Sequence, residues 1–155
     1  MKVLVQRVSR AEVRVDGRVV GQIARGLVVL LGVEKTDTLS IASWYARRIA
    51  AMKFFADEQG HRWRCCAKEV AAEVLVVSQF TLAAQTRKGR RPSFDPAAAP
   101  ELAEMLYEHF LAALETAGLP IARGVFGAQM EVELVNDGPV TFLLEGPSET
   151  SGGAH

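Results

Sequence analysis

Alternating hydrophobicity marks the first part of the chain. Residues 2–8 form a strand candidate, and residues 9–15 alternate between apolar and polar positions, which is typical of a strand with one buried face. Asp16-Gly17 follows, and this dipeptide favours a tight hairpin turn, so residues 18–23 are expected to return as a second strand. The pattern therefore predicts antiparallel pairing at the start of the chain.

Two stretches are apolar throughout instead of alternating. Residues 26–33 form one of them, and residues 74–77, with three β-branched side chains in four, form the other. Continuous apolar runs of this length predict strands that are buried on both faces. A short strand is also expected at 53–56, ended by the polar run 57–60, whereas 61–68 shows no clear pattern.

Two segments carry helical periodicity. Asp37 or Thr38 can cap a helix that runs to about Met52. Pro100 suits the first turn of a second helix, which Gly118 ends. His109 falls on the apolar side of this second helix, as expected for a packing residue rather than a catalyst. The expected apolar stripe consists of Leu102, Met105, Leu106, His109, Phe110 and Ala113.

The last strands are expected to form a hairpin. Residues 130–135 alternate, Asn136-Asp137-Gly138 has the composition of a turn, and residues 140–144 would return. The fold class predicted from all elements is α/β of the α+β type, with mixed, mostly antiparallel sheets in a barrel-like layered arrangement and two main helices on one side. Residues 1–145 are expected to form a single domain, and 146–155 a flexible C-terminal tail.

Composition restricts the classes of function. The 155 residues include 18 basic and 18 acidic side chains, so no net charge attracts the whole molecule to nucleic acid or membrane, and a nucleic-acid contact needs a local patch. No apolar run approaches the roughly 18 residues of a membrane span, and the N-terminal stretch is too short for a signal peptide. Cys65 and Cys66 are adjacent and are expected to be reduced thiols, not a metal site. These features predict a cytoplasmic protein.

The first candidate for chemistry follows the second apolar run. Ser78, Gln79 and Thr81 place three polar side chains, with Phe80 among them, directly after a buried strand. Polar groups at such a strand end need hydrogen-bond partners, which either neighbouring loops or a ligand can supply. The motif alone leaves both interpretations open.

Residues that commonly act as acid or base are scarce. The three histidines are His61, His109 and His155, and none lies in a polar motif or is an obvious base for Ser78. The sequence also lacks the glycine-rich phosphate loops, the dinucleotide motif and the zinc-helix motif. An enzyme with this sequence would depend on backbone amides and on an activated water or substrate hydroxyl.

Two further segments offer binding chemistry. Four cations lie shortly after the polar motif and are candidates for phosphate contacts, although a solvated loop can have the same composition. These cations, here named the basic loop, are Arg87, Lys88, Arg90 and Arg91. Gly138-Pro139 presents carbonyls without a proline N–H, which fits either an ordinary turn or a rigid tip that offers carbonyls to a ligand.

Taken together, these motifs resemble the D-aminoacyl-tRNA deacylase family, also known as D-tyrosyl-tRNA deacylases. The resemblance covers roughly residues 1–145. It is carried by residues 6–8, 26–34, 74–82, 88–94, 126–130 and 136–141. Two features depart from the family pattern. Gly-His-Arg-Trp-Arg occupies 60–64 where the family has a Gly-Lys-Met-Asn type of sequence, and the tail after Glu145 is longer than usual.

The resemblance implies a homodimeric hydrolase without metal or cofactor, whose partner is tRNA. It would cleave the ester between a D-amino acid and tRNA, and would remove glycine from mischarged tRNA for alanine. The implied catalytic floor of the pocket consists of Ser78, Gln79, Phe80 and Thr81. Phe126 and Met130 would wall the pocket, and Gly138 and Pro139, in a cis peptide, would reach into the partner subunit's pocket, braced by Arg7.

Two mechanistic questions remain open at this level. Because Thr81 has no evident base, a free 2′-hydroxyl on the terminal adenosine of the tRNA is expected to assist the attacking water. The alternative to an enzyme is a non-catalytic RNA-binding or ribosome-associated dimeric module, or a purely structural dimer, in which the motif at 78–81 serves only the fold.

Overall fold

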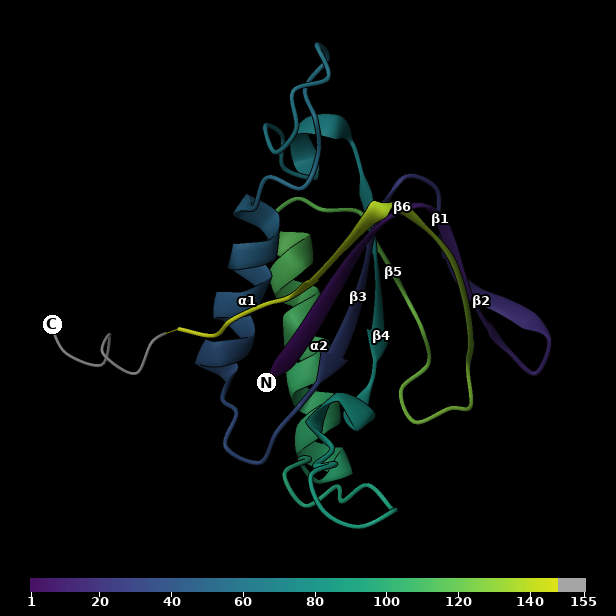
Figure 1. Cartoon of the computed structure of the whole chain (residues 1–155), viewed down its shortest axis with the longest axis vertical. Helices are drawn as coiled ribbons and strands as arrows, with labels where there is room; N and C mark the ends of the chain where they lie inside the picture. The colour runs from purple at the N-terminus through teal and green to yellow at the C-terminus, as the bar shows by residue number, and fades with distance from the viewer. Residues whose placement is uncertain (148–155) are drawn as a thin grey trace, which may run out of the picture.

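The computed structural model describes residues 1–147, so most of the expected tail, from residue 148 onward, lies outside the described residues. A six-stranded sheet has the order β2-β1-β3-β4-β5, and β6 pairs with β1 (Figure 1). The strands are β1 Lys2–Val15, β2 Arg18–Ile23, β3 Gly26–Gly32, β4 Glu73–Ser78, β5 Ile121–Arg123 and β6 Glu131–Leu143. The helices are α1 Leu39–Ala51 and α2 Pro100–Thr116, with 3-10 turns at Lys68–Val70 and Phe80–Ala83. Neither α1 nor α2 is long and apolar enough to cross a membrane.

Strand β1 organises the sheet because it has three partners. Its first half pairs antiparallel with β3, its second half with β2, and β6 follows it along most of its length. β4 joins β3 in parallel, and β5 joins β4 in parallel. Gly21 on β2 approaches β5 so closely that a Cβ there would overlap the carbonyl of Arg123, so the sheet nearly closes on itself. The mixed, mostly antiparallel, barrel-like sheet predicted from the sequence is confirmed.

Each face of the sheet has its own core. Alternate residues of the central strands, such as Val3, Val29 and Val76, are fully buried against α1 and α2. Their neighbours Val28 and Leu75 point the other way, into a smaller cluster inside the curved sheet. The continuous apolar runs at 26–33 and 74–77 are explained by this double burial. Both helices lie on the same side of the sheet, as predicted (Figure 1).

The helix boundaries follow from their capping residues. Thr38 Oγ1 accepts a hydrogen bond from the Ile41 N–H at 3.3 Å, and Pro100 is the first residue of α2. The apolar stripe of α2 differs in one respect from the expected one, because Met105 is 52% exposed. Tyr107 is buried in its place, since the face that meets α1 and the sheet is rotated slightly. The buried residues of α2 are Leu106, Tyr107, Phe110, Leu111 and Leu114.

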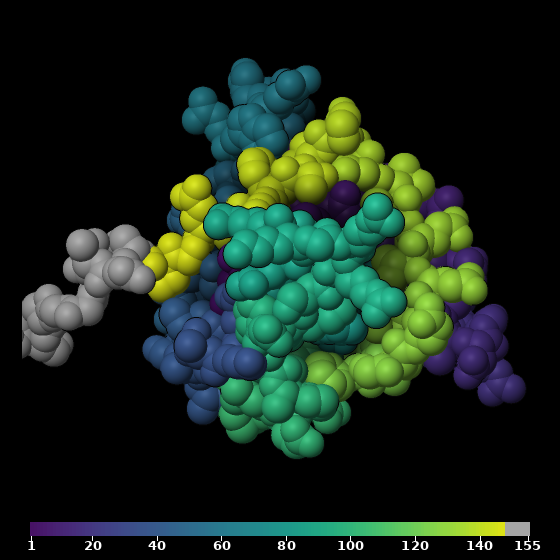
Figure 2. Space-filling model, turned by 60° about the horizontal axis from the view of Figure 1, so that its bottom comes forward, coloured from purple at the N-terminus to yellow at the C-terminus, as the bar shows by residue number. Residues whose placement is uncertain are grey.

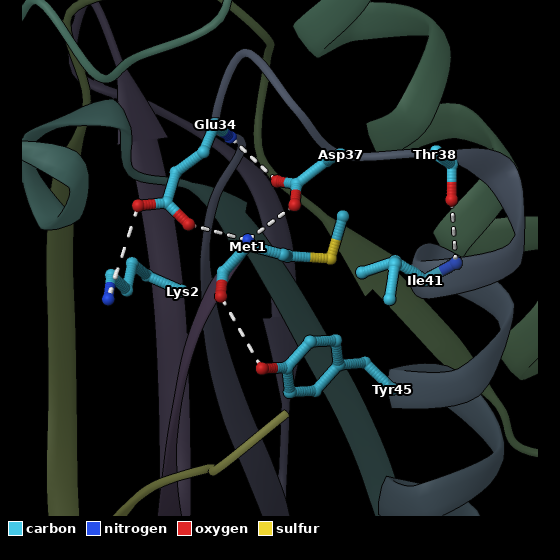
Figure 3. Close-up of polar contacts among 7 residues, drawn as sticks. All are labelled: Met1, Lys2, Glu34, Asp37, Thr38, Ile41 and Tyr45. Atoms are coloured by element: carbon cyan, nitrogen blue, oxygen red, sulfur yellow. Dashed lines mark hydrogen bonds and ion pairs between the residues drawn. The ribbon is translucent and has the colours of Figure 1, made fainter. Parts of the chain in front are cut away.

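The amino group of Met1 forms a partly buried polar cluster with the segment that follows β3 (Figure 3). It donates to Glu34 Oε2 at 2.6 Å and to Asp37 Oδ1 at 2.5 Å. The other oxygen of Asp37 accepts the Glu34 N–H at 2.7 Å, and Tyr45 Oη donates to the Met1 carbonyl at 3.4 Å. A charged group removed from water needs such partners, so this cluster fixes the start of β1 to the entry of α1.

The expected C-terminal hairpin is wrong, because β6 is one strand that continues through residues 136–140. Gln6 pairs with Thr141 and Val8 with Asn136, so a single residue of β1, Arg7, faces the four residues 137–140, here named the β6 bulge. Asn136 closes the bulge: its side-chain amide donates to Thr141 Oγ1 at 2.8 Å, and its Oδ1 accepts the Val140 N–H at 2.9 Å. Residues typical of a turn therefore lie inside a strand, because β1 is long enough to pair with the parts of β6 on both sides of them.

The strand expected at 53–56 is also wrong. Only Phe55 forms a β-bridge there, to Cys65. Phe54 and Phe55 are both buried in the larger core cluster, so their apolar pattern reflects packing and not sheet pairing.

Candidate active site

The polar motif begins where β4 ends. The Gln79 N–H donates to the Leu31 carbonyl at 2.7 Å, which is the last bond that ties the motif to β3. The chain then turns into the 3-10 segment Phe80–Ala83, whose first internal bond runs from the Leu82 N–H to the Gln79 carbonyl at 3.2 Å. The amides of Phe80 and Thr81 precede that bond, so they have no partner within the turn.

Side chains of the motif are only partly engaged with one another. Gln79 Nε2 donates to Thr81 Oγ1 at 2.5 Å, and Ser78 is half-buried at the end of the strand. Phe80 is 58% exposed and packs its ring against Phe94, with the ring centroids 5.1 Å apart. A large aromatic side chain held by a single aromatic neighbour leaves apolar surface available to a ligand or a second chain.

A cavity of about 490 Å³ opens beside this turn. Its lining is mainly apolar and includes five of the residues that the sequence nominated: Ser78, Gln79, Phe80, Phe126 and Met130. Thr81 is exposed next to the cavity but does not line it. The structure therefore brings the end of β4 and the segment before β6 together at one cavity.

Helix α2 supplies a wall that the sequence did not predict. Tyr107 lines the cavity, packs against Phe126 with ring centroids 5.8 Å apart, and donates its hydroxyl to the Val76 carbonyl at 3.0 Å. Burial raises the pKa of Tyr107 to about 12, so it stays a neutral hydrogen-bond donor. The sequence indicated only that Tyr107 lies three residues before Phe110 on a helix. This spacing does not distinguish a residue that lines a pocket from a residue of the core.

The β6 bulge lies outside this cavity. Gly138-Pro139 is a cis peptide, both residues are exposed, and neither lines the pocket of its own chain. The side chain of Arg7 contacts the bulge. Its Nε donates to the Asp137 carbonyl at 3.1 Å and lies 3.5 Å from the Asp137 carboxylate. One terminal nitrogen of Arg7 donates to the Phe54 carbonyl at 2.8 Å.

The basic loop lies at the same end of the molecule as the pocket. In Figure 2 the teal segment that carries it extends across this end, and a hollow separates it from the green segment near residues 120–130. Arg87 and Lys88 line a second, more polar cavity of about 680 Å³ together with Lys2. All four cations are exposed, and among residues 1–147 none of them forms an ion pair.

The two described histidines serve the fold. His109 Nε2 lies 2.7 Å from Ser43 Oγ, so this pair joins α2 to α1. His61 Nδ1 lies 3.0 Å from the Asp57 carboxylate in an exposed loop. His155 lies outside the described residues. Within residues 1–147 no group of three or more histidine, cysteine or acidic side chains is arranged to hold a metal ion.

Comparison with known proteins identifies the family. A family model described as D-Tyr-tRNA(Tyr) deacylase matches residues 4–145. A D-aminoacyl-tRNA deacylase of Geobacter metallireducens is 52% identical over 152 residues, which is 98% of this chain and 100% of that protein. A second one, from Alcanivorax borkumensis, is 53% identical over 94% of this chain and 99% of its own. The chain belongs to the D-Tyr-tRNA(Tyr) deacylase family.

Solved structures agree with this assignment. A structure named c-Myc DNA Unwinding Element Binding Protein superposes on this deacylase-family chain with a TM-score of 0.88 at 43% identity, over 96% of this chain and 100% of the other. A probable eukaryotic D-amino acid tRNA deacylase superposes with a TM-score of 0.81, over 92% of this chain and 97% of the other. At 17% identity, this second likeness shows the fold alone.

Proposed function

We propose that this chain hydrolyses the ester bond of D-aminoacyl-tRNA, and that it also accepts glycyl-tRNA mischarged on tRNA for alanine. The observation that carries the proposal is the turn after β4, which places the amides of Phe80 and Thr81, without a partner within that turn, beside an apolar cavity. Backbone amides that are free to donate can stabilise the oxyanion that forms when water attacks an ester, and each such donor is typically worth about 3 kcal/mol. The deacylase relatives support the choice of substrate.

The attacking water is activated by the substrate itself in this proposal. Neither described histidine lies at the pocket, and Thr81 accepts its only side-chain hydrogen bond from an amide, Gln79, which cannot act as a base. The terminal adenosine of an aminoacyl-tRNA keeps a free hydroxyl next to the ester. Such proximity can supply about 7 kcal/mol or more of the barrier when the groups are well aligned.

A homodimer completes each pocket in this proposal, and the register of the sheet supports it. Arg7 pairs with Leu27 and Leu27 with Val74, so the β6 bulge lies level with the start of β4, whereas the motif follows its end at Ser78. The bulge and the motif are therefore about 13 Å apart along the strands. The three strand spacings from β6 to β4 add about 14 Å across the strands. A bulge anchored at both ends is too short to span this separation along the sheet, which supports a pocket completed by a second copy.

Rejection of L-substrates follows from the same arrangement. The carbonyls of Gly138 and Pro139 would accept the α-amino group of the substrate and leave no space for an L side chain. Discrimination by steric exclusion does not require strong contacts with the accepted substrate. Glycine has no side chain to exclude, which is why glycyl-tRNA is expected to be cleaved as well.

The basic loop would bind the phosphate backbone of tRNA, since its four cations are exposed at the end of the molecule where the pocket opens. A tRNA substrate also fits a cytoplasmic location. A nucleic-acid-binding module without chemistry is the second candidate, favoured by the name of the solved neighbour at 43% identity and by the same basic loop.

Single-turnover deacylation of D-, L- and glycyl-tRNA separates these candidates. Hydrolysis of the D- and glycyl-substrates, but not of the L-substrate, is the expected result, whereas binding without any hydrolysis would favour the module. Two matched comparisons then test the mechanism. Thr81→Ala should retain much of the wild-type rate, and a substrate that ends in 2′-deoxyadenosine should react far more slowly while binding normally. The reverse pattern would identify Thr81 as a nucleophile.

A further inference from the structure

The segment that departs from the family pattern contains an unusual residue. Trp63 has a φ of +61°, in the left-handed region that bulky side chains rarely occupy. It is also 46% exposed, so burial of the whole indole does not explain the conformation. A residue persists in this region only where its surroundings hold it, and such residues cluster at functional sites.

The contacts of Trp63 point toward the β6 bulge. The guanidinium carbon of Arg7 lies 6.0 Å from the centroid of the indole, within the range of a cation–π contact. The ring also meets Phe142 of β6 edge-on, with centroids 5.9 Å apart at 74°. Phe142 in turn packs on Phe54, with centroids 5.9 Å apart, and the carbonyl of Phe54 accepts one of the bonds from Arg7.

Arg7 is consequently held by three groups from three parts of the chain. They are the Phe54 carbonyl, the Asp137 carbonyl and carboxylate, and the ring of Trp63. Its side chain is only 18% exposed, although Arg7 lies opposite an exposed bulge. Gly138 lies directly beyond it, since a Cβ built there would be 3.4 Å from a terminal nitrogen of Arg7.

We propose that Trp63 is a positioning residue that keeps the guanidinium of Arg7 against Asp137 and thereby fixes the orientation of the β6 bulge. This inference rests on the proposed function, in which the bulge excludes L-substrates from the partner subunit's pocket. Without the indole, water reaches the open face of the guanidinium and competes with the bond to Asp137. The bulge then samples more orientations, and an L side chain is excluded less strictly.

Three variants test the role of the indole in the intact dimer. Trp63→Ala should lower the ratio of D- to L-aminoacyl-tRNA cleavage by about 5-fold, the factor expected when one cation–π interaction is removed. Trp63→Phe keeps an aromatic face and should restore most of the ratio. Arg62→Ala, in the same loop, is the control for a general effect of the loop and should keep the wild-type ratio.

The interaction with Arg7 is tested by a double substitution. In an Arg7→Ala background, Trp63→Ala should change the D/L ratio no further, because the group it positions is gone. Equal effects of Trp63→Ala in both backgrounds would overturn the inference, as would an unchanged ratio in wild-type background. A KM increase for tRNA with an unchanged D/L ratio would assign Trp63 to RNA contact instead.

A measurement independent of activity keeps this inference distinct from the proposed function. The side-chain Nε–H of Arg7 should give a resolved NMR resonance shifted by the indole ring current, and Trp63→Ala should move it and accelerate its exchange with water. If no D-aminoacyl-tRNA is cleaved, the proposed function fails while this resonance still reports on the contact. An Nε–H resonance that is identical in wild type and Trp63→Ala overturns the positioning role.

Discussion

Replacing Gly138 with alanine is the sharpest single test of the β6 bulge. The residue has a φ of +142°, which alanine rarely adopts, and a Cβ there would lie 2.6 Å from Val140 Cγ2 and 2.8 Å from the Val140 backbone nitrogen. A backbone contact this short cannot be relieved by rotating a side chain. The bulge itself must therefore move.

The size of the effect follows from these two penalties. A non-glycine residue in such a conformation costs about 1–3 kcal/mol, and overpacking adds about 1–3 kcal/mol. Because the bulge is exposed and short, part of this cost is relieved by displacement, and a net loss of about 1–2 kcal/mol in unfolding free energy is expected. That corresponds to a fall in melting temperature of roughly 2–8 °C for a chain of this size.

The functional loss should be similar in size to the loss of stability. Displaced carbonyls at residues 138 and 139 should lower single-turnover cleavage of D-aminoacyl-tRNA by at least about 10-fold, equivalent to ~1.4 kcal/mol of activation free energy. Gly17→Ala is the matched control, since Gly17 also has a positive φ, of +77°, but nothing lies within 4 Å of its Cβ position. If Gly138→Ala retains the wild-type rate and D/L ratio, the bulge does not belong to the active site.

Three other predictions concern binding and stability. Changing all four cations of the basic loop to alanine should reduce the log–log salt slope of tRNA binding by about 1 for each phosphate that is no longer neutralised, as measured by filter binding, whereas Arg47→Ala on α1 should leave it unchanged. Asp37→Ala should cost about 2 kcal/mol in urea unfolding, because it removes one of the two acidic partners of the partly buried Met1 amine; a cost no larger than that of a surface substitution would contradict the role of the cluster. A hydrogen bond from Lys53 and another from the Cys66 N–H lower the pKa of Glu69 from 4.5 to about 2. Its stabilising effect is therefore present above pH 4.5 and lost as the pH falls toward 2, so Glu69→Gln should flatten the melting-temperature profile over that interval.

Local signals were sufficient where one segment determines its own conformation. Asp16-Gly17 forms the expected hairpin between β1 and β2, with both residues at positive φ. Thr38 and Pro100 begin the two helices as predicted. The β6 bulge shows the limit of such signals, because the same turn residues close either a hairpin or a bulge. A bulge forms instead of a hairpin when a distant strand is long enough to pair with the residues before and after the turn sequence. Strand β1 is long enough to do so.

The candidate site could be predicted in part for the same reason. The change from apolar to polar side chains at Ser78 marks the end of a buried strand, and this located the turn beside the pocket. The wall formed by Tyr107 depends on how α2 is rotated against the sheet, which periodicity fixes only to within a residue or so. The three-residue strand β5 was not predicted, since a segment this short has no measurable period and is defined only by its pairing with β4.

The start of the chain and the pocket are linked through one segment. Glu34, which accepts a bond from the Met1 amine, forms a β-bridge with Ala97, and the Ala98 N–H donates to the Val33 carbonyl at 3.0 Å. Val33, Ala97 and Ala98 all line the cavity beside the motif. The polar cluster at Met1 therefore fixes the backbone that bears one wall of the pocket. Loosening the cluster should allow that wall to move, so substitutions in the cluster should weaken substrate affinity. The rate of the chemical step should stay the same, because the turn that carries Phe80 and Thr81 is held separately by Leu31.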